Sequence, residues 1–185
     1  MSAIRALAVC LVLAVSAVAP SAAQPQGGAY RGPDLAAQRA AIARLAPLVG
    51  EWRGEAQVAF PGPMTVFQHE RVETDLDGLV LVVHGAGYGD AAYGGEPIFQ
   101  AMAVISYNDQ SGVYEFRAYN EGRAVTAEAQ FLEDGSLRWS MSPPGVQIRY
   151  TISFDQTSWR EIGEMSRDGG QTWTRTIEMN LNRVS

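Results

Sequence analysis

Four glutamates, Glu70, Glu115, Glu128 and Glu161, lie in stretches of strand-like sequence where a carboxyl group could act as a general acid or base. Two carboxyl groups held a few ångströms apart form the arrangement that glycosidases use to cleave sugars. The sequence does not decide which of the four share a face. Acid–base catalysis by a strand glutamate therefore stays open as one hypothesis.

Arg175 interrupts the apolar face predicted for the last strand. An unpaired buried charge is costly, so we expect a carboxylate beside it. If the preceding hairpin loop is 168–170, Arg175 faces Gly163 with Glu161 on the diagonal; if the loop is one residue shorter, it faces Glu164. The pair is then either an internal salt bridge or an anchor for an acidic or hydroxylated ligand.

The two histidines, His69 and His84, lie on predicted strands that flank a turn at Asp77 and Gly78. With that turn as the loop, His69 pairs with position 86, close to His84 but not opposite it. Two histidines are too few for a three-histidine zinc site. We therefore predict no metal site, and we place both histidines on the surface or on the rim of a pocket.

Residues 166–173 spell SRDGGQTW, which matches the Asp-box turn found in repeated copies in sialidase propellers. A propeller needs many blades and a longer chain, and the motif occurs here once. We predict a structural hairpin in which the Asp168 carboxylate caps turn amides, Gly170 takes a positive φ and Trp173 packs beneath.

A glycine-rich stretch, GAGYGDAAYGG, occupies residues 85–95. It has neither the GxGxxG nor the Walker spacing, and no helical pattern follows it to bind a phosphate. We expect a mobile loop that carries Tyr88 and Tyr93, either as a lid over an open barrel end or as an inert connection.

The N-terminus predicts a secretory signal peptide, because Arg5 is followed by an apolar run over 6–19 and by small residues up to Ala23. That run is shorter than the roughly 18 to 20 residues of a membrane span. We expect cleavage after Ala23 and a periplasmic or extracellular protein. Residues 24–32 form a flexible leader, and 33–185 form a single domain. The alternative is an uncleaved anchor.

Composition excludes several classes of protein. The only cysteine, Cys10, leaves with the signal peptide, so the mature chain has no disulfide, thiolate metal site or cysteine nucleophile. The chain has 14 basic and 20 acidic side chains and a net charge of -6, which becomes -7 when Arg5 is removed. Such a chain does not suit nucleic acid or anionic membranes as partners.

The pattern from Pro33 onward predicts one helix and then about ten short strands. Pro33 and Asp34 begin the helix, and Pro47 and Gly50 end it; Leu35, Ile42 and Leu45 lie on one face. The strands are expected at 51–59, 64–76, 79–87, 98–108, 113–120, 123–132, 136–141, 146–155, 158–166 and 171–182. Their short links favour antiparallel neighbours and leave no room for crossover helices. We predict an all-β, calycin- or lipocalin-like antiparallel barrel, with a β-sandwich as the alternative.

The segment LAPLVGEWRG at 45–54 resembles the GxW opening of calycin-type barrels. It is most similar to the nitrobindin-like heme-binding β-barrels and to exported DUF1579-type proteins. The resemblance implies that Gly50 opens the first strand and that Trp52 packs across the barrel bottom beneath Arg183 from the last strand. Nitrobindin-like proteins carry a heme-ligating histidine in a late strand. This chain has none after His84, so we expect no heme and no other cofactor.

Export, a barrel and aromatic strands together favour an exported protein that binds a small, partly apolar molecule without transforming it. A barrel enzyme with a strand glutamate as acid or base is the first alternative, and a structural envelope protein with a filled core is the second. Interior size and one anchoring charge indicate the following ligand-binding candidates: Phe67, Met102, Tyr119, Trp139, Trp159, Glu161 and Arg175.

Overall fold

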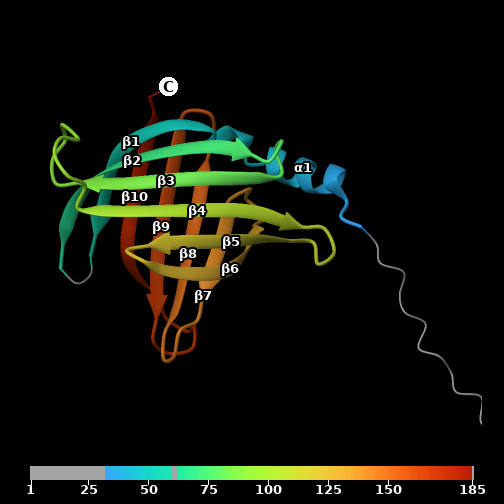
Figure 1. Ribbon diagram of the computed structural model, residues 1–185. Helices are drawn as coiled ribbons and strands as arrows, with labels where there is room; N and C mark the ends of the chain where they lie inside the picture. The colour runs from blue at the N-terminus through green and yellow to red at the C-terminus, as the bar shows by residue number, and fades with distance from the viewer. Residues whose placement is uncertain (1–31, 60–61, 185) are drawn as a thin grey trace, which may run out of the picture. The chain divides into compact units, whose positions relative to one another are not determined.

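A computed structural model describes residues 32–59 and 62–184. The predicted signal peptide, and all of the predicted leader except Gly32, lie outside the described residues. From Pro33 onward the chain forms one compact unit in which a helix, α1 (Leu35–Ala43), precedes ten strands (Figure 1). The strands are β1 (Gly50–Val58), β2 (Met64–Asp75), β3 (Val80–Tyr88), β4 (Phe99–Asn108), β5 (Val113–Asn120), β6 (Arg123–Phe131), β7 (Leu137–Met141), β8 (Gln147–Phe154), β9 (Ser158–Ser166) and β10 (Thr174–Arg183).

The strands follow the predicted ranges closely, and the largest difference is at β10. This strand begins at Thr174 instead of Gln171. The Asp168 carboxylate accepts hydrogen bonds from the backbone N–H groups of Gln171 and Thr172, at 3.0 and 2.9 Å, so these residues belong to the turn. The same turn places the Trp173 indole N–H 3.0 Å from the Gly170 carbonyl, and Gly170 has a φ of +90°.

Asp34 caps the N-terminus of α1, and its carboxylate accepts a hydrogen bond from the Ala37 N–H at 3.0 Å. Ile42 and Leu45 are buried, as the pattern predicts. The prediction for Leu35 is wrong, because this side chain is 41% exposed. The buried contacts of α1 begin only in its second half, so its first turn has nothing to cover.

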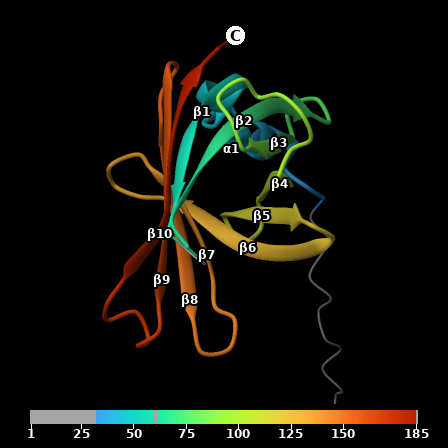
Figure 2. The same cartoon turned by 90° about the vertical axis from the view of Figure 1, so that its left-hand side faces the viewer.

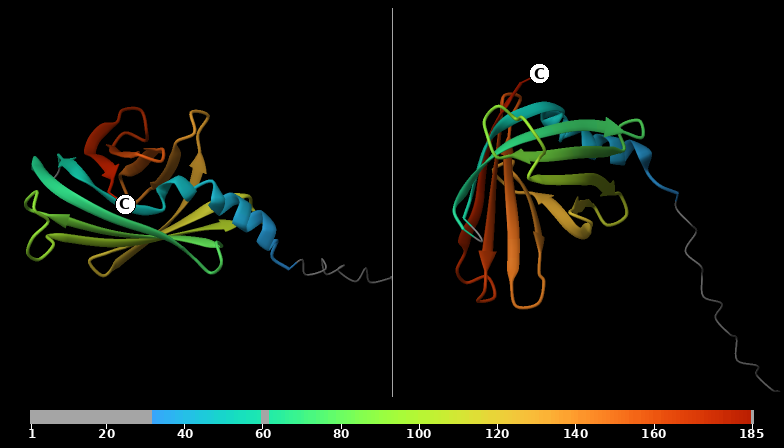
Figure 3. Two further views of the ribbon diagram at one scale, coloured as in Figure 1. Left: turned by 90° about the horizontal axis from the view of Figure 1, so that it is seen from above. Right: turned by 60° about the vertical axis from the view of Figure 1, so that its left-hand side comes forward.

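Two connecting turns hold α1 at one end of the barrel. The Asp109 carboxylate, after β4, accepts hydrogen bonds from the Asp34 N–H and the Gln38 side-chain amide, at 3.0 and 2.6 Å. Arg39 forms an ion pair of 2.6 Å with Asp77, after β2. Seen from above, α1 runs along this end of the strands (Figure 3). No helix among the described residues is long and apolar enough to cross a membrane.

Every strand pairs antiparallel with its sequence neighbours, and β1 also pairs with β10 to close a ten-stranded barrel (Figure 2). The closed pairing excludes the sandwich alternative, because a sandwich keeps two separate sheets. The register of the β2–β3 hairpin is the predicted one, with His69 opposite Ala86. Side chains on each strand alternate between the interior and the outer face.

Trp52 seals the end of the interior next to α1. Its ring is fully buried, and its indole N–H donates to the Leu48 carbonyl at 2.7 Å. The Arg183 guanidinium lies 4.2 Å from the centre of the ring and donates to two backbone carbonyls of residues 47–49. Gly50 has a φ of +134°, which favours glycine where the chain enters β1. The tryptophan and arginine thus have the arrangement that the resemblance implies.

Candidate functional site

The barrel interior has a sealed half beside α1 and a more open half at the other end. In the sealed half, inward side chains are at most 1% exposed, as for Leu45, Leu48, Trp52, Leu81 and Ile105. In the other half, inward side chains keep partial exposure, as for Ala101, Ala118, Val125, Tyr150 and Ile177. The interior therefore opens away from α1, toward the end where the β3–β4 and β7–β8 connections lie.

Glu70 on β2 points into the interior and is 6% exposed. The Gln68 side-chain amide donates a 2.7 Å hydrogen bond to one oxygen of its carboxyl group. Gly85 on β3 lies opposite, and a Cβ atom there would come within 2.8 Å of both carboxyl oxygens, so glycine leaves the space that Glu70 fills. Burial raises the pKa of Glu70 to about 8, although the Gln68 hydrogen bond acts in the opposite direction.

Glu161 on β9 also points inward, between Ile152 on β8 and Met179 on β10. It is surrounded by protein and is only partly exposed. Burial raises the pKa of Glu161 to about 7, while the nearby Trp159 indole lowers it. Its carboxyl group thus titrates near neutral pH.

Both carboxyl groups face the interior, on strands that β1 and β10 separate. The charge of Glu161 adds to the increase in the pKa of Glu70. It also adds to the increase that burial causes in the pKa of Tyr150. No arginine of the described segments contributes to the pKa shift of either glutamate. We call Gln68, Glu70, Tyr150 and Glu161 the interior acid cluster.

Three aromatic rings form a stack next to this cluster. Trp139 on β7 lies between Phe116 on β5 and Tyr150 on β8, with ring centres 4.5 and 4.3 Å apart and planes within 11°. The Trp139 indole N–H is buried and has no hydrogen-bond partner among the described residues. A buried donor without a partner is uncommon in a folded protein, and a bound molecule could supply the acceptor.

Three of the predicted ligand-binding residues lie in the interior, namely Trp139, Trp159 and Glu161. Trp159 packs edge to face against Trp52, with ring centres 5.9 Å apart, so it belongs to the sealed half. Trp139 and Glu161 remain at the acid cluster.

The expectation that Phe67, Met102 and Tyr119 point inward is wrong. Phe67 lies on the outer face of β2, where its ring contacts Tyr93 at 6.4 Å between centres. Met102 and Tyr119 are paired across β4 and β5 on the outer face, and Tyr119 is 45% exposed. All three have the opposite parity to the buried positions of their strands.

Arg175 is also outside the barrel, contrary to its prediction as a buried anchor. It pairs with Glu164 in the backbone register, which is one of the two predicted alternatives, but its ion pair is with Glu178 on the surface. A β-bulge between Arg175 and Ile177 shifts the alternation, so that Ile177 takes the inward position instead.

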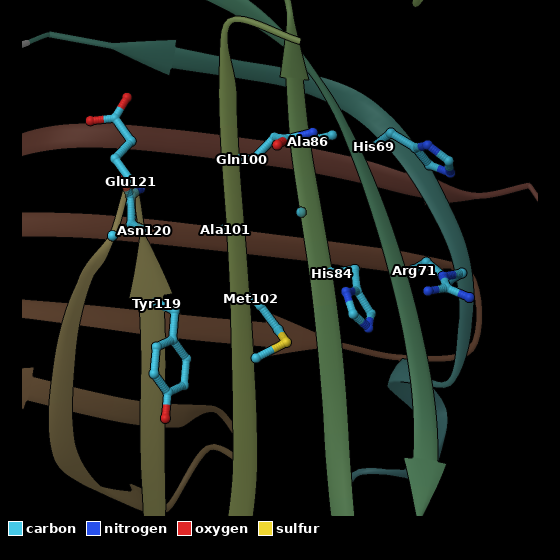
Figure 4. Close-up of a pocket in the computed structure, with 12 residues that line it drawn as sticks. His69, Arg71, His84, Ala86, Gln100, Ala101, Met102, Tyr119, Asn120 and Glu121 are labelled. Carbon is cyan, nitrogen blue, oxygen red and sulfur yellow. The ribbon is translucent and has the colours of Figure 1, made fainter.

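The outer face of β2 to β5 carries a shallow groove of about 450 Å³ that includes both histidines (Figure 4). The His69 Nε2 lies 3.5 Å from Glu51, and the His84 Nε2 lies 3.8 Å from Glu73. In residues 32–59 and 62–184 no three histidine, cysteine or acidic side chains group to hold a metal ion. The wall of this groove combines apolar side chains with a few polar and charged ones: Ala86, Met102, Tyr119, His69, Arg71, His84 and Glu121.

The glycine-rich connection between β3 and β4 does not place its tyrosines over the interior. Tyr93 packs on the outer face of β1 and β2, against Phe67, His69 and Tyr88. The Arg53 guanidinium lies 4.9 Å from the centre of its ring. The lid expectation is therefore wrong for Tyr93.

Sequence reasoning missed two members of the acid cluster, Gln68 and Tyr150, and considered Glu70 only as a general strand carboxylate. The signal was present in β2, where Val66 and Val72 share parity with Gln68 and Glu70. A strand whose apolar face contains two polar residues places those residues inside the protein.

No protein-family model matches the sequence, and no curated protein matches it significantly. Solved structures with a similar fold include Rv2717c from M. tuberculosis, with a TM-score of 0.57 and 15% identity over 78% of this chain and 98% of that one. Another is the S-type phycobiliprotein lyase CPES from Guillardia theta, with a TM-score of 0.55 and 12% identity over 83% and 99%. At these identities the likeness shows the fold alone. The described chain is a closed, ten-stranded, calycin-like barrel preceded by one short helix.

Proposed function

We propose that this protein binds a small, partly apolar molecule inside the open half of its barrel, without transforming it. The observation that carries the proposal is the pair of interior carboxyl groups, Glu70 and Glu161, whose pKa values burial raises to about 8 and about 7. Placing carboxyl groups in an interior without a cation beside them is costly, and apolar side chains would stabilise the barrel more. Shifted carboxyl groups in such a place are typical of a functional site.

The surroundings of the pair fit a ligand that is partly apolar. The aromatic stack and the partly exposed Ala118 and Ile177 supply apolar surface, while the cluster supplies hydrogen-bonding groups. Small-molecule sites commonly combine a mainly apolar wall with a few polar groups. One of the similar barrels is a phycobiliprotein lyase, so the fold can serve proteins that handle small molecules.

Export to the periplasm or the medium and membership in the DUF1579-type group are parts of the same proposal. Export rests on the apolar run at 6–19 and the small residues before Ala23. The group rests on Gly50 and Trp52, together with the position of Arg183 over the tryptophan ring.

A second candidate function is acid–base catalysis in the same interior. It is favoured by the pKa of Glu161, which lies near neutral pH, where a general acid or base is most effective. The pKa of Glu70 is higher, at about 8, so Glu70 would stay protonated where Glu161 is ionised, and the two could act as acid and base. A catalyst would release its compound in altered form, whereas a binding protein would return it unchanged.

Native mass spectrometry of the mature protein, isolated from its own cells, tests the proposal. We expect an added small-molecule mass that disappears on denaturation and returns unchanged when the released compound is added back. Two variants that fill the open half, Ala118→Phe and Ala101→Leu, should prevent rebinding. Ala124→Phe on the outer face of β6 is the matched control and should rebind normally. Circular dichroism confirms that each variant is folded.

A protein that carries no added mass, and that binds nothing from an extract of its own cells, would contradict the proposal. Rebinding that survives both interior variants would place the ligand elsewhere. Recovery of a chemically altered compound would favour the catalytic candidate.

A further inference from the structure

We infer that the interior site selects a ligand in which a protonated amine is attached to an apolar ring. The inference rests on the proposed function, because it names the ligand class for the same interior. It follows from the charges that face the interior, from the ring surface beside them and from the lack, among residues 32–59 and 62–184, of a cation that neutralises the carboxyl groups.

In the part of the chain that the structure describes, the charged side chains at the site are acids only. The inward positions of the neighbouring strands are Trp52 on β1, Gly85 on β3, Ile152 on β8 and Met179 on β10, none of which carries a charge. Tyr150 is a further titratable group, and it lies close to Glu161. A ligand that completes this cluster must therefore donate hydrogen bonds or bring a positive charge.

Two arginines share the inward parity of their strands, but neither reaches the cluster. The Arg183 guanidinium lies over the Trp52 ring and donates its hydrogen bonds to backbone carbonyls. Arg123 is exposed at the start of β6, where it pairs with Asn120 at the barrel end. A carboxylate ligand would thus enter a site with two acids and no compensating cation, so anions should be excluded.

An ammonium group suits both glutamates because it presents three N–H donors and one positive charge. Carboxyl oxygens of Glu70 and Glu161 accept such bonds best when ionised, and charge-assisted hydrogen bonds are stronger than neutral ones. The amine therefore displaces a proton from the cluster when it binds, and the proton is released to solvent. Affinity should increase as pH rises from about 6 to about 8, and should fall again near pH 10, where an alkylamine loses its charge.

The ring of the ligand is placed by the aromatic stack. Tyr150 is the member of the stack that keeps partial exposure, and it is also the one that responds to the charge of Glu161. An aromatic or other flat apolar group beside Tyr150 would therefore hold an attached amine close to that carboxyl group. The buried N–H of Trp139 would be satisfied by an acceptor on the ring or by a bound water.

Isothermal titration calorimetry with matched probes tests the inference. The probes are 2-phenylethylamine, 2-phenylethanol and phenylacetate, with the corresponding naphthyl compounds as larger versions. At pH 7.5 we expect each amine to bind about 10- to 100-fold more tightly than its alcohol, and the carboxylates to bind most weakly. Titration in two buffers of different ionisation enthalpy should show release of about one proton per amine.

Glu161→Gln should reduce amine affinity at least about tenfold and change alcohol affinity little, because it removes only the negative charge. Glu128→Gln is the control, since Glu128 is exposed on the outer face of β6. Alcohols that bind as tightly as amines, or an amine affinity that Glu161→Gln leaves unchanged, would overturn the inference.

The results separate interior ligand binding from selectivity for amines. If the alcohols bind and Ala118→Phe abolishes their binding, the proposed function stands and the amine inference fails. If no probe binds, the compound released from the native protein decides: a cationic amine supports the inference, and a neutral or anionic compound overturns it. If the native protein carries no compound and none of the probes binds, both the proposed function and the amine inference are overturned.

Discussion

Replacing Glu70 with glutamine should make the protein more stable at alkaline pH. Burial raises the pKa of Glu70 from 4.5 to about 8, so the folded protein holds a proton that the unfolded chain has released. The free energy of unfolding therefore decreases as pH rises from about 4.5 to 8. At 1.36 kcal/mol per pKa unit, the loss is ~3 kcal/mol at pH 7 and ~5 kcal/mol once both states are ionised. An amide of the same shape does not titrate and escapes this loss.

Urea denaturation at intervals from pH 5 to pH 9 measures the effect. We expect Glu70→Gln to differ from wild type by less than ~1 kcal/mol at pH 5 and to be more stable by ~3 kcal/mol at pH 7. The Gln68 amide keeps its acceptor, because a glutamine at position 70 retains a carbonyl oxygen in place of the carboxyl oxygen. Glu128→Gln is the control and should follow the wild-type pH dependence.

A Glu70→Gln curve that runs parallel to wild type would refute the interior placement of this carboxyl group. So would a variant that is less stable than wild type at pH 8, because that result would mean that the folded protein stabilises the ionised form.

Four further predictions concern other parts of the barrel. Arg183→Met should lower the free energy of unfolding by ~2 kcal/mol or more, measured by urea denaturation, because it removes hydrogen bonds to backbone carbonyls and the cation above the tryptophan ring. Gly54→Ala should prevent stable folding, seen by circular dichroism, because its Cβ would lie 2.0 Å from the Asn180 backbone oxygen; normal folding would contradict the β1–β10 pairing. Asp168→Asn should speed hydrogen exchange of the turn amides at 169–172. Hydrogen bonds from the turn hold the pKa of Asp168 below its usual range, so wild type should show the same change only when strong acid protonates this carboxylate. Arg175→Met should leave both stability and ligand binding unchanged, since that side chain is exposed, and a loss of binding would restore its anchor role.

The layout of the barrel could be predicted because each hairpin carries its own local signals. Turn residues such as Asp77 and Gly78 fix the β2–β3 register, and the structure pairs His69 with Ala86 as that turn requires. Closure of the barrel follows from the need to cover two strand edges.

The site was predicted less well, because short sequence patterns do not reveal the details that decide whether a strand residue faces the interior or the surface. The β-bulge after Arg175 adds one residue, and this shift moves Ile177 inward and leaves Arg175 on the surface. The size of Phe67 suggests a pocket residue, yet the buried residues of its strand include Val66 and Val72. Phe67 lies on the alternate positions, so its side chain faces outward. Aromatic side chains occur on outer faces too, so size alone does not identify a pocket.

The pairing of Glu70 with Glu161 could not be predicted because it depends on the curvature of the closed sheet. Their strands are separated by two others, and their interaction crosses the interior instead of following the hydrogen-bonded ladder. Only the full barrel brings the two carboxyl groups together.

A carboxyl-carbon NMR titration of Glu70 and Glu161, without ligand and with 2-phenylethylamine, tests the interior acid cluster most directly. The account predicts midpoints of about 8 and about 7 in the free protein, and lower midpoints for both groups in the amine complex. Midpoints near 4.5 for both groups in the free protein would mean that the carboxyl groups are solvated, and would contradict the site on which the proposed function rests.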